Sequence, residues 1–227
     1  MKKIGMLVAI QREMRAVLAR YGKAMAEENR HGFQVYTYDM GDYLLYVVGS
    51  GAGEIAAAAA CQLLIDRYEV ELVVNFGVVG GLTEEMSRTK TCVVERVVHY
   101  DFDSSAYDNT VPAQYAEYPD VYLPATAPLV RRAVEIAPEL RIVTCASADK
   151  FVDDREAKIA LHEKYGAEIC EMEAAGVVLT CNRSGVACLL IKAVSDGLAG
   201  GAEEFETAVL HTAELALEVA DKIIREL

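Results

Sequence analysis

Apolar residues fall into two kinds of run along this chain of 227 residues. Near-continuous apolar runs predict strands that are buried on both faces, and residues 3–10 form the first of these. Residues 33–40 and 43–48, on either side of Gly41-Asp42, predict a hairpin-like pair of strands. The remaining strands predicted in this way are 72–76, 91–99, 141–146 and 187–194.

Between these strands, apolar residues recur three and four positions apart, which is the spacing of an amphipathic helix. The helices predicted by this spacing are 12–21, 54–66, 129–136, 153–165, a segment through Val177 to Ser184, and 202–227. Residues 100–126 have no clear period, and a loop this long is more often a lid, a binding loop or a contact surface than filler. No linker, repeat or low-complexity segment divides the chain, so we expect one α/β domain over residues 1–227.

The composition agrees with a sheet covered on both faces. Hydrophobic residues make up 53% of the chain, there is no tryptophan, and Val, Ile, Leu and Ala dominate. The formal charge of −13 argues against broad contact with nucleic acid phosphates or with anionic lipid. A small-molecule substrate is therefore favoured, with no nucleic acid partner and no membrane partner.

The cysteines and the first apolar run of the chain indicate in which cell compartment the protein is expected. Six cysteines are scattered without a CxxC pair, and most lie in apolar patterns, so we expect buried free thiols. The first apolar run is too short for a signal peptide and lacks a cleavage pattern. No stretch approaches the ~20 apolar residues of a membrane span. We therefore expect a soluble, cytoplasmic protein.

Three acids lie just beyond predicted strands. Glu13 follows the first strand, Glu173 lies in the run Ile169 to Ala175 before a helix, and Asp196 follows the last strand. Each could be only a helix cap or a first-turn acid. Burying unpaired carboxylates costs on the order of several kcal/mol each, and a purely structural role rarely explains such a cost. If the three converge, their pKa values should be pushed apart, which suits separate acid and base roles.

Two glycine-rich segments and one acidic pair have weaker meanings. Gly51, Gly53 and Ala56 fit a loose dinucleotide-binding pattern, but the next strand, 72–76, ends without the acid that would hold a ribose. Residues 77–81 are predicted to be a second glycine-rich turn at a strand end. The acids Asp101 and Asp103 have no matching metal ligands nearby, so we expect solvated acids and no metal site.

Four motifs together resemble one family. They are Asn75-Phe-Gly-Val-Val-Gly-Gly81, Ser147-Ala-Asp-Lys-Phe151-Val152, Glu171-Met172-Glu173-Ala174 and Ser195-Asp196. With these in order, the chain resembles the 5′-methylthioadenosine/S-adenosylhomocysteine nucleosidases of the purine nucleoside phosphorylase superfamily over nearly its whole length. The resemblance implies a three-layer α/β/α sandwich with a central mixed, partly barrel-like sheet. It also implies one nucleoside phosphorylase-like domain, a homodimer, and no cofactor.

The resemblance assigns catalytic roles to acids. It implies that Glu13 activates the attacking water and that Asp196 protonates N7 of the purine. It implies that Glu173 binds the ribose hydroxyls, whereas Glu171 helps hold the junction or the water. Protonating the leaving base is typically worth ~10²–10⁴-fold in rate.

The remaining site residues are expected to contact the nucleoside. By resemblance, Phe151 stacks on the base, the backbone of Val152 meets the purine edge, and Met172 packs beside the sugar. Val78 lies in the glycine-rich segment near the water, and Ser195 precedes the acid of the last motif.

Water is favoured over phosphate as the nucleophile. Asn75 stands where related phosphorylases have a phosphate-binding arginine. In addition, the carboxylate of Glu13 would repel phosphate by on the order of several kcal/mol. Asp196 stands where guanine-selective relatives have asparagine, which points to a 6-aminopurine such as adenine.

The chain also departs from the family in four places. Val78 replaces a small hydroxyl residue, Lys192 replaces an arginine, and Ile10 replaces a methionine. No aromatic counterpart for the 5′ group is evident near Ala202. The alternatives are a phosphorolytic or futalosine-type enzyme and a non-catalytic nucleoside-binding protein.

Overall fold

The computed structural model describes all residues, 1–227. The chain forms ten strands and seven helices. The strands are β1 Lys2–Val8, β2 Ala26–Arg30, β3 Phe33–Asp39, β4 Tyr43–Gly49, β5 Leu72–Gly81, β6 Thr91–His99, β7 Tyr122–Pro124, β8 Arg141–Ser147, β9 Ile169–Glu171 and β10 Ala187–Asp196. The helices are α1 Gln11–Tyr21, α2 Glu54–Tyr68, α3 Ser105–Asp108, α4 Ala127–Ile136, α5 Arg155–Tyr165, α6 Ala174–Ser184 and α7 Ala202–Arg225.

One mixed sheet contains all ten strands, and part of it closes on itself. The order is β10-β6-β8-β9-β5-β1-β4-β3-β2, and β10 also pairs with β5. The five strands β10, β6, β8, β9 and β5 therefore form a closed, barrel-like ring. Parallel pairs such as β1 with β5 and antiparallel pairs such as β10 with β6 occur together. This confirms the predicted mixed, partly barrel-like sheet.

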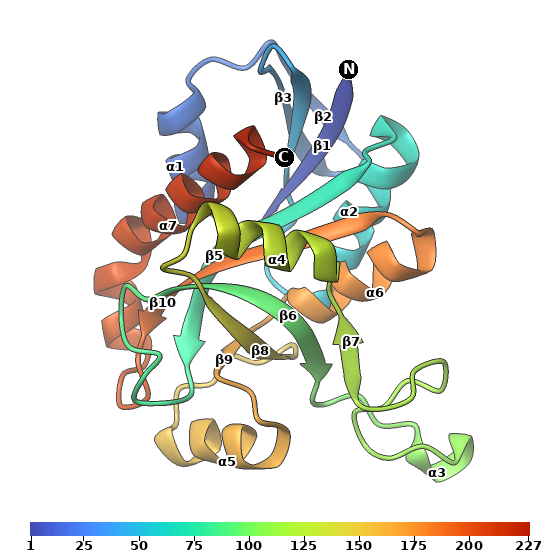
Figure 1. The fold of residues 1–227 in the computed structure, drawn as a ribbon, viewed down its shortest axis with the longest axis vertical. Coiled ribbons are helices and arrows are strands. Elements are labelled where there is room, and N and C mark those ends of the chain that lie inside the picture. The colour runs from blue at the N-terminus through green and yellow to red at the C-terminus, as the bar shows by residue number, and fades with distance from the viewer.

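Helices cover this sheet on two sides (Figure 1). α1 packs beside α7, and α7 also contacts β5 and β10. On the other side α2 packs against α6, and α2 contacts β1 and β4. A core cluster of 58 buried residues fills the space between these layers. The arrangement confirms the three-layer α/β/α sandwich.

β5 is longer than the apolar pattern predicted, and the prediction of a glycine-rich turn over 77–81 was wrong. The strand continues to Gly81, because Gly80 and Gly81 pair with Cys170 and Ile169 of β9. A β-carbon on Gly81 would lie 1.9 Å from the carbonyl oxygen of Met86, so the glycine permits a close approach of two backbone segments.

The structure contains elements that the apolar pattern did not predict. β2 is an exposed edge strand with the sequence Ala-Glu-Glu-Asn-Arg, and therefore has no apolar period. Within residues 100–126 lie the four-residue helix α3 and the three-residue strand β7. All six cysteines are buried and free, as predicted. None of the helices combines the length and the apolar character needed to cross a membrane.

Candidate active site

A cavity of about 180 Å³ opens where β5, β9 and β10 end. The cavity is lined by residues from seven separate segments of the chain. All nine site residues proposed from the sequence are among them: Glu13, Val78, Phe151, Val152, Glu171, Met172, Glu173, Ser195 and Asp196. The fold therefore brings these residues together, at the carboxyl ends of strands where α/β sheets commonly bind ligands.

Glu13 lies in the first turn of α1 and is buried. Its carboxylate accepts backbone N–H groups from Ala9 at 3.2 Å, Ile10 at 3.1 Å and Val78 at 2.9 Å. Burial raises the pKa of Glu13, and these backbone donors oppose the shift. A β-carbon on Gly77 would lie 2.5 Å from Glu13 Oε1. Glu13 thus caps its helix and also faces the cavity.

The two glutamates of the Glu-Met-Glu motif have different surroundings. Glu171 accepts N–H groups from Glu173 at 3.1 Å and Ala174 at 2.9 Å, so it holds the start of α6. Glu173 accepts one N–H, from Gly53 at 3.0 Å. Burial and then the nearby Glu171 raise the pKa of Glu173. Glu173 therefore keeps more of its hydrogen-bonding capacity free for a ligand.

Lys192 is a buried cation in contact with Glu171, one of the acids of the cavity. Its Nζ donates to Asn75 Oδ1 at 2.6 Å and to Glu171 Oε2 at 3.1 Å. Burial opposes its charge, but Glu171 and Glu173 raise the pKa of Lys192 overall. The cation thus offsets the negative charge of Glu171 and of the nearby Glu173 without itself lining the cavity.

Asp196 is held by two side chains. Its Oδ2 accepts from Lys158 Nζ at 2.7 Å and its Oδ1 accepts from Ser195 Oγ at 2.9 Å. Lys158 is fully buried and also donates to the carbonyl oxygens of Gly197 at 2.8 Å and Gly200 at 3.0 Å. Burial raises the pKa of Asp196 in spite of these donors.

Two residues at or behind the cavity, Phe205 and Lys158, escaped the sequence-based prediction. Phe205 of α7 lines the cavity, and its ring lies 5.6 Å from that of Phe151 at an interplanar angle of 74°. The cavity therefore has an aromatic side chain close to Ala202, where the sequence showed no clear counterpart for the aromatic residue of the 5′ group. Lys158 was also missed, although its position on the same face of α5 as Leu161 and Tyr165 is a signal of burial.

The described side chains include no group of three or more His, Cys, Asp or Glu residues arranged to hold a metal ion. The cavity lining contains one cationic side chain, Lys150, next to Phe151. Most of the charged side chains that line the cavity are thus carboxyl groups.

The model of the phosphorylase superfamily matches residues 3–227. The chain belongs to this superfamily. A 5′-methylthioadenosine/S-adenosylhomocysteine nucleosidase from Oceanobacillus iheyensis is 28% identical, over 97% of this chain and 99% of that protein. An aminodeoxyfutalosine nucleosidase from Campylobacter jejuni is 25% identical over 100% of both chains. The resemblance to nucleosidases is thereby confirmed.

Solved structures give the same result. A 5′-methylthioadenosine/S-adenosylhomocysteine nucleosidase from Helicobacter pylori, complexed with an amino-pyrrolopyrimidine ligand, superposes with a TM-score of 0.93 at 25% identity. The alignment covers 100% of this chain and 99% of that one. The native futalosine hydrolase from Helicobacter pylori has a TM-score of 0.92 at 25% identity, covering 100% of this chain and 98% of that one. Backbone similarity therefore does not separate the two activities.

Proposed function

We propose that the protein is a purine nucleosidase that hydrolyses the N-glycosidic bond of an adenine nucleoside and releases adenine. The observation that carries the proposal is the convergence of Glu13, Glu173 and Asp196 on one cavity. The nucleosidase names of full-length relatives support this reaction class.

The three acids fit the charges that develop in this reaction. As the bond breaks, the sugar gains oxocarbenium character and the purine gains negative charge. Asp196, whose raised pKa favours the protonated form, would deliver a proton to N7 of the leaving base. Glu173 would bind the ribose hydroxyls and stabilise the sugar cation. Glu13 would accept a proton from the attacking water.

The charges around the cavity favour water over phosphate. Asn75, at the position of a phosphate-binding arginine in related phosphorylases, is engaged by Lys192. No arginine lines the cavity, while Glu13, Glu173 and Asp196 all do. A phosphate dianion would find no arginine to bind and would meet the carboxylate of Glu13 at low effective dielectric, which is strongly unfavourable.

We propose a substrate of the 5′-methylthioadenosine or S-adenosylhomocysteine type. Ile10, Met172 and Phe205 give the cavity apolar walls that suit a thioether group. Aminodeoxyfutalosine is the second candidate, because a nucleosidase of that name matches the whole chain. We also propose one domain over residues 1–227, a homodimer, and a cytoplasmic location in keeping with six free thiols.

The test is adenine release from a panel of substrates, with and without phosphate. The panel contains methylthioadenosine, adenosylhomocysteine, aminodeoxyfutalosine, adenosine and inosine. We expect phosphate-independent turnover of at least one of the first three, little turnover of inosine, and a loss of ~10²–10⁴-fold in kcat for Asp196→Asn. Turnover that requires phosphate, tight nucleoside binding without turnover, or near-normal hydrolysis by Asp196→Asn would each contradict the proposal.

A further inference from the structure

Two buried acids outside the proposed chemistry share one hydroxyl group. Ser147 Oγ lies 2.5 Å from Glu171 Oε1 and also forms a short hydrogen bond with Glu54 Oε1. The same oxygen accepts the backbone N–H of Ala175 at 3.2 Å. Glu54, Ser147 and Glu171 are all buried, so the protein itself must satisfy their hydrogen bonds.

Counting hydrogens places a proton on one of the acids. A serine hydroxyl has a single hydrogen, which it can donate to only one of the two carboxyl groups. The other carboxyl must therefore donate a hydrogen of its own to Ser147. If both carboxyl groups were ionised, one of them would face the oxygen of Ser147 with no hydrogen between the two oxygens. Such a contact is repulsive, and the low dielectric of the interior strengthens the repulsion.

The partners of each acid decide which one holds the proton. Glu171 contacts the cation of Lys192 and accepts N–H groups from Glu173 and Ala174, so it is the carboxylate. Apart from Ser147, the carboxyl of Glu54 has one partner, the N–H of Gly176 at 2.5 Å, and it belongs to no ion pair.

The charged and titratable groups around Glu54 are mostly acidic or neutral. Its own backbone N–H donates to Asp149 Oδ1 at 2.7 Å. Burial and then the charge of Glu171 raise the pKa of Glu54 to about 8, and Asp149 adds to the shift. Tyr100 and Tyr115 also lie near enough to interact with its charge. No cation contacts Glu54 to oppose these effects.

We infer that Glu54 is a positioning residue that carries a proton at neutral pH. Through Ser147 it holds in place the segment 171–173, which contains the proposed ribose-binding residue Glu173. It connects the start of α2 to the start of α6 through Gly176. The preceding residue, Gly53, donates its N–H to Glu173. The position of Glu173 therefore depends on both helix ends. The catalytic consequence rests on the proposed function, whereas the location of the proton does not.

The sign of the pH effect follows from the proton count. Between the ordinary pKa of a glutamate, ~4.3, and about 8, folded Glu54 holds a proton that the unfolded chain has released. Stability therefore falls as pH rises through this window. One such proton corresponds to roughly 3–5 °C of Tm per pH unit in a protein of this size.

The experiment compares Glu54→Gln with the wild type by thermal unfolding between pH 6 and pH 9. An amide reproduces the protonated acid, because its NH₂ donates to Ser147 and its oxygen accepts from Gly176. Below about pH 8, the Tm of the wild type should fall more steeply with pH than the Tm of Glu54→Gln. We expect the two slopes to differ by roughly 3–5 °C per pH unit. Asp66→Asn, an acid-to-amide change at an exposed position of the same helix, should leave the slope unchanged.

Kinetics test the positioning role. We expect Glu54→Ala to raise KM about tenfold at pH 7, with a smaller change in kcat, and Glu54→Gln to restore KM. In the wild type KM should rise above about pH 8, and in Glu54→Gln it should rise less. A wild-type KM for Glu54→Ala would overturn the positioning role.

The pH dependence of Tm and the hydrolysis kinetics test two different statements, and either can be contradicted without the other. Identical pH dependence of Tm in the wild type and Glu54→Gln would overturn the proton on Glu54, whatever the substrate. If the slopes differ as expected but none of the nucleosides is hydrolysed, the proton placement is supported and the proposed function is wrong. If Glu54→Ala does not fold, the Glu54→Gln comparison still decides the location of the proton.

Discussion

Asp196 is subject to two opposing influences at hydrogen-bond distance. The proposed reaction needs a proton on this acid, and burial favours that form. The fully buried ammonium of Lys158, 2.7 Å away, favours the carboxylate. The lysine therefore sets an upper limit on the pH at which Asp196 stays protonated.

Replacing Lys158 should move this limit. In Lys158→Met the cation is gone and burial remains, so the pKa of Asp196 should rise. The alkaline limb of the kcat profile should then move to higher pH by about one to three units. Lys158→Arg keeps a cation and should move the limb less. The measurement is kcat between pH 5 and pH 10 on the best substrate of the panel.

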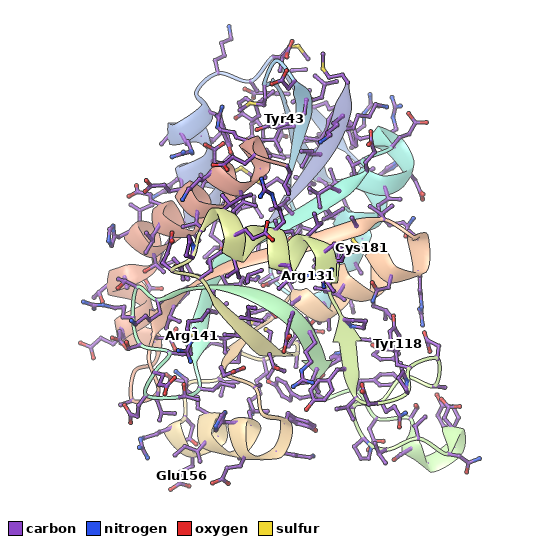
Figure 2. All side chains as sticks on the ribbon, viewed as in Figure 1. Tyr43, Tyr118, Arg131, Arg141, Glu156 and Cys181 are labelled. Carbon is purple, nitrogen blue, oxygen red and sulfur yellow. The ribbon has the colours of Figure 1, made fainter.

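A matched lysine on the same helix provides the control. Lys164 is exposed on α5, so Lys164→Met changes the charge of the protein equally without contacting Asp196. Figure 2 shows another exposed residue of this helix, Glu156, on the outer side of the molecule. An alkaline limb that stays in place in Lys158→Met would show that the lysine does not tune Asp196.

The residues of the cavity differ in how well the sequence predicts them. Glu13 and Glu173 lie shortly after the ends of β1 and β9, and Asp196 is the last residue of β10, so the local pattern places them at one sheet edge. Lys158 and Phe205 lie inside helices, where their nearest partners are 38 and 54 residues distant along the chain. Local spacing indicates that such side chains are buried but not what they contact. The proton that we infer on Glu54 likewise depends on its contact with Ser147, which is 93 residues away along the chain.

The same distinction applies to whole elements. β1, β4 and β10 have apolar runs that identify them without tertiary information. β2 is strand only because it pairs with β3, so its exposed polar residues give no period. The end of β5 is strand only because β9 pairs with it. Pairing between distant segments, rather than local propensity, decides these elements.

The contact between α1 and α7 depends on one buried acid. Asp221 of α7 accepts from Arg20 Nη2 at 2.6 Å and from the hydroxyl of Tyr21 at 2.9 Å, both on α1. It also accepts from Arg225 of its own helix at 2.9 Å. Burial opposes the charge, but these donors keep the pKa of Asp221 below its ordinary value.

Asp221→Asn should therefore destabilise the protein. The amide presents two hydrogens to three donors, so we expect a loss of about 1–3 kcal/mol in the free energy of unfolding. At this size that corresponds to a fall of roughly 2–12 °C in Tm. Glu218→Gln, on the exposed face of the same helix, is the control and should change Tm little. Equal Tm values for the two variants would contradict a structural role for Asp221.

At the scale of the whole molecule, the segment between β6 and α4 stands apart from the layers. Figure 1 shows α3 and its flanking chain projecting at one end, away from α1 and α7. Within it Phe102 and Tyr115 stack at 4.0 Å, and Tyr115 hydrogen bonds to His99 at 2.8 Å. The segment is thus internally packed. Yet Tyr107 is 79% exposed and Val111 is 53% exposed.

Exposed apolar side chains on an ordered projection suit a surface that is covered in a homodimer. If the proposed dimer uses this segment, Tyr107→Arg combined with Val111→Arg should shift the protein from dimer to monomer at micromolar concentration. Two buried charges without partners cost several kcal/mol, which is ample to weaken an interface of ~1,600 Å². The measurement is molar mass by light scattering during size-exclusion chromatography.

Met25 is the control for this change. It is 63% exposed and belongs to the connection between α1 and β2. Figure 1 shows α1 and β2 at the end of the molecule opposite α3. Met25→Arg should leave the molar mass unchanged. A wild-type protein that elutes as a monomer would refute the dimer itself. A dimer that persists in the double variant would instead place the interface on another surface, because the arginines would then remain in solvent.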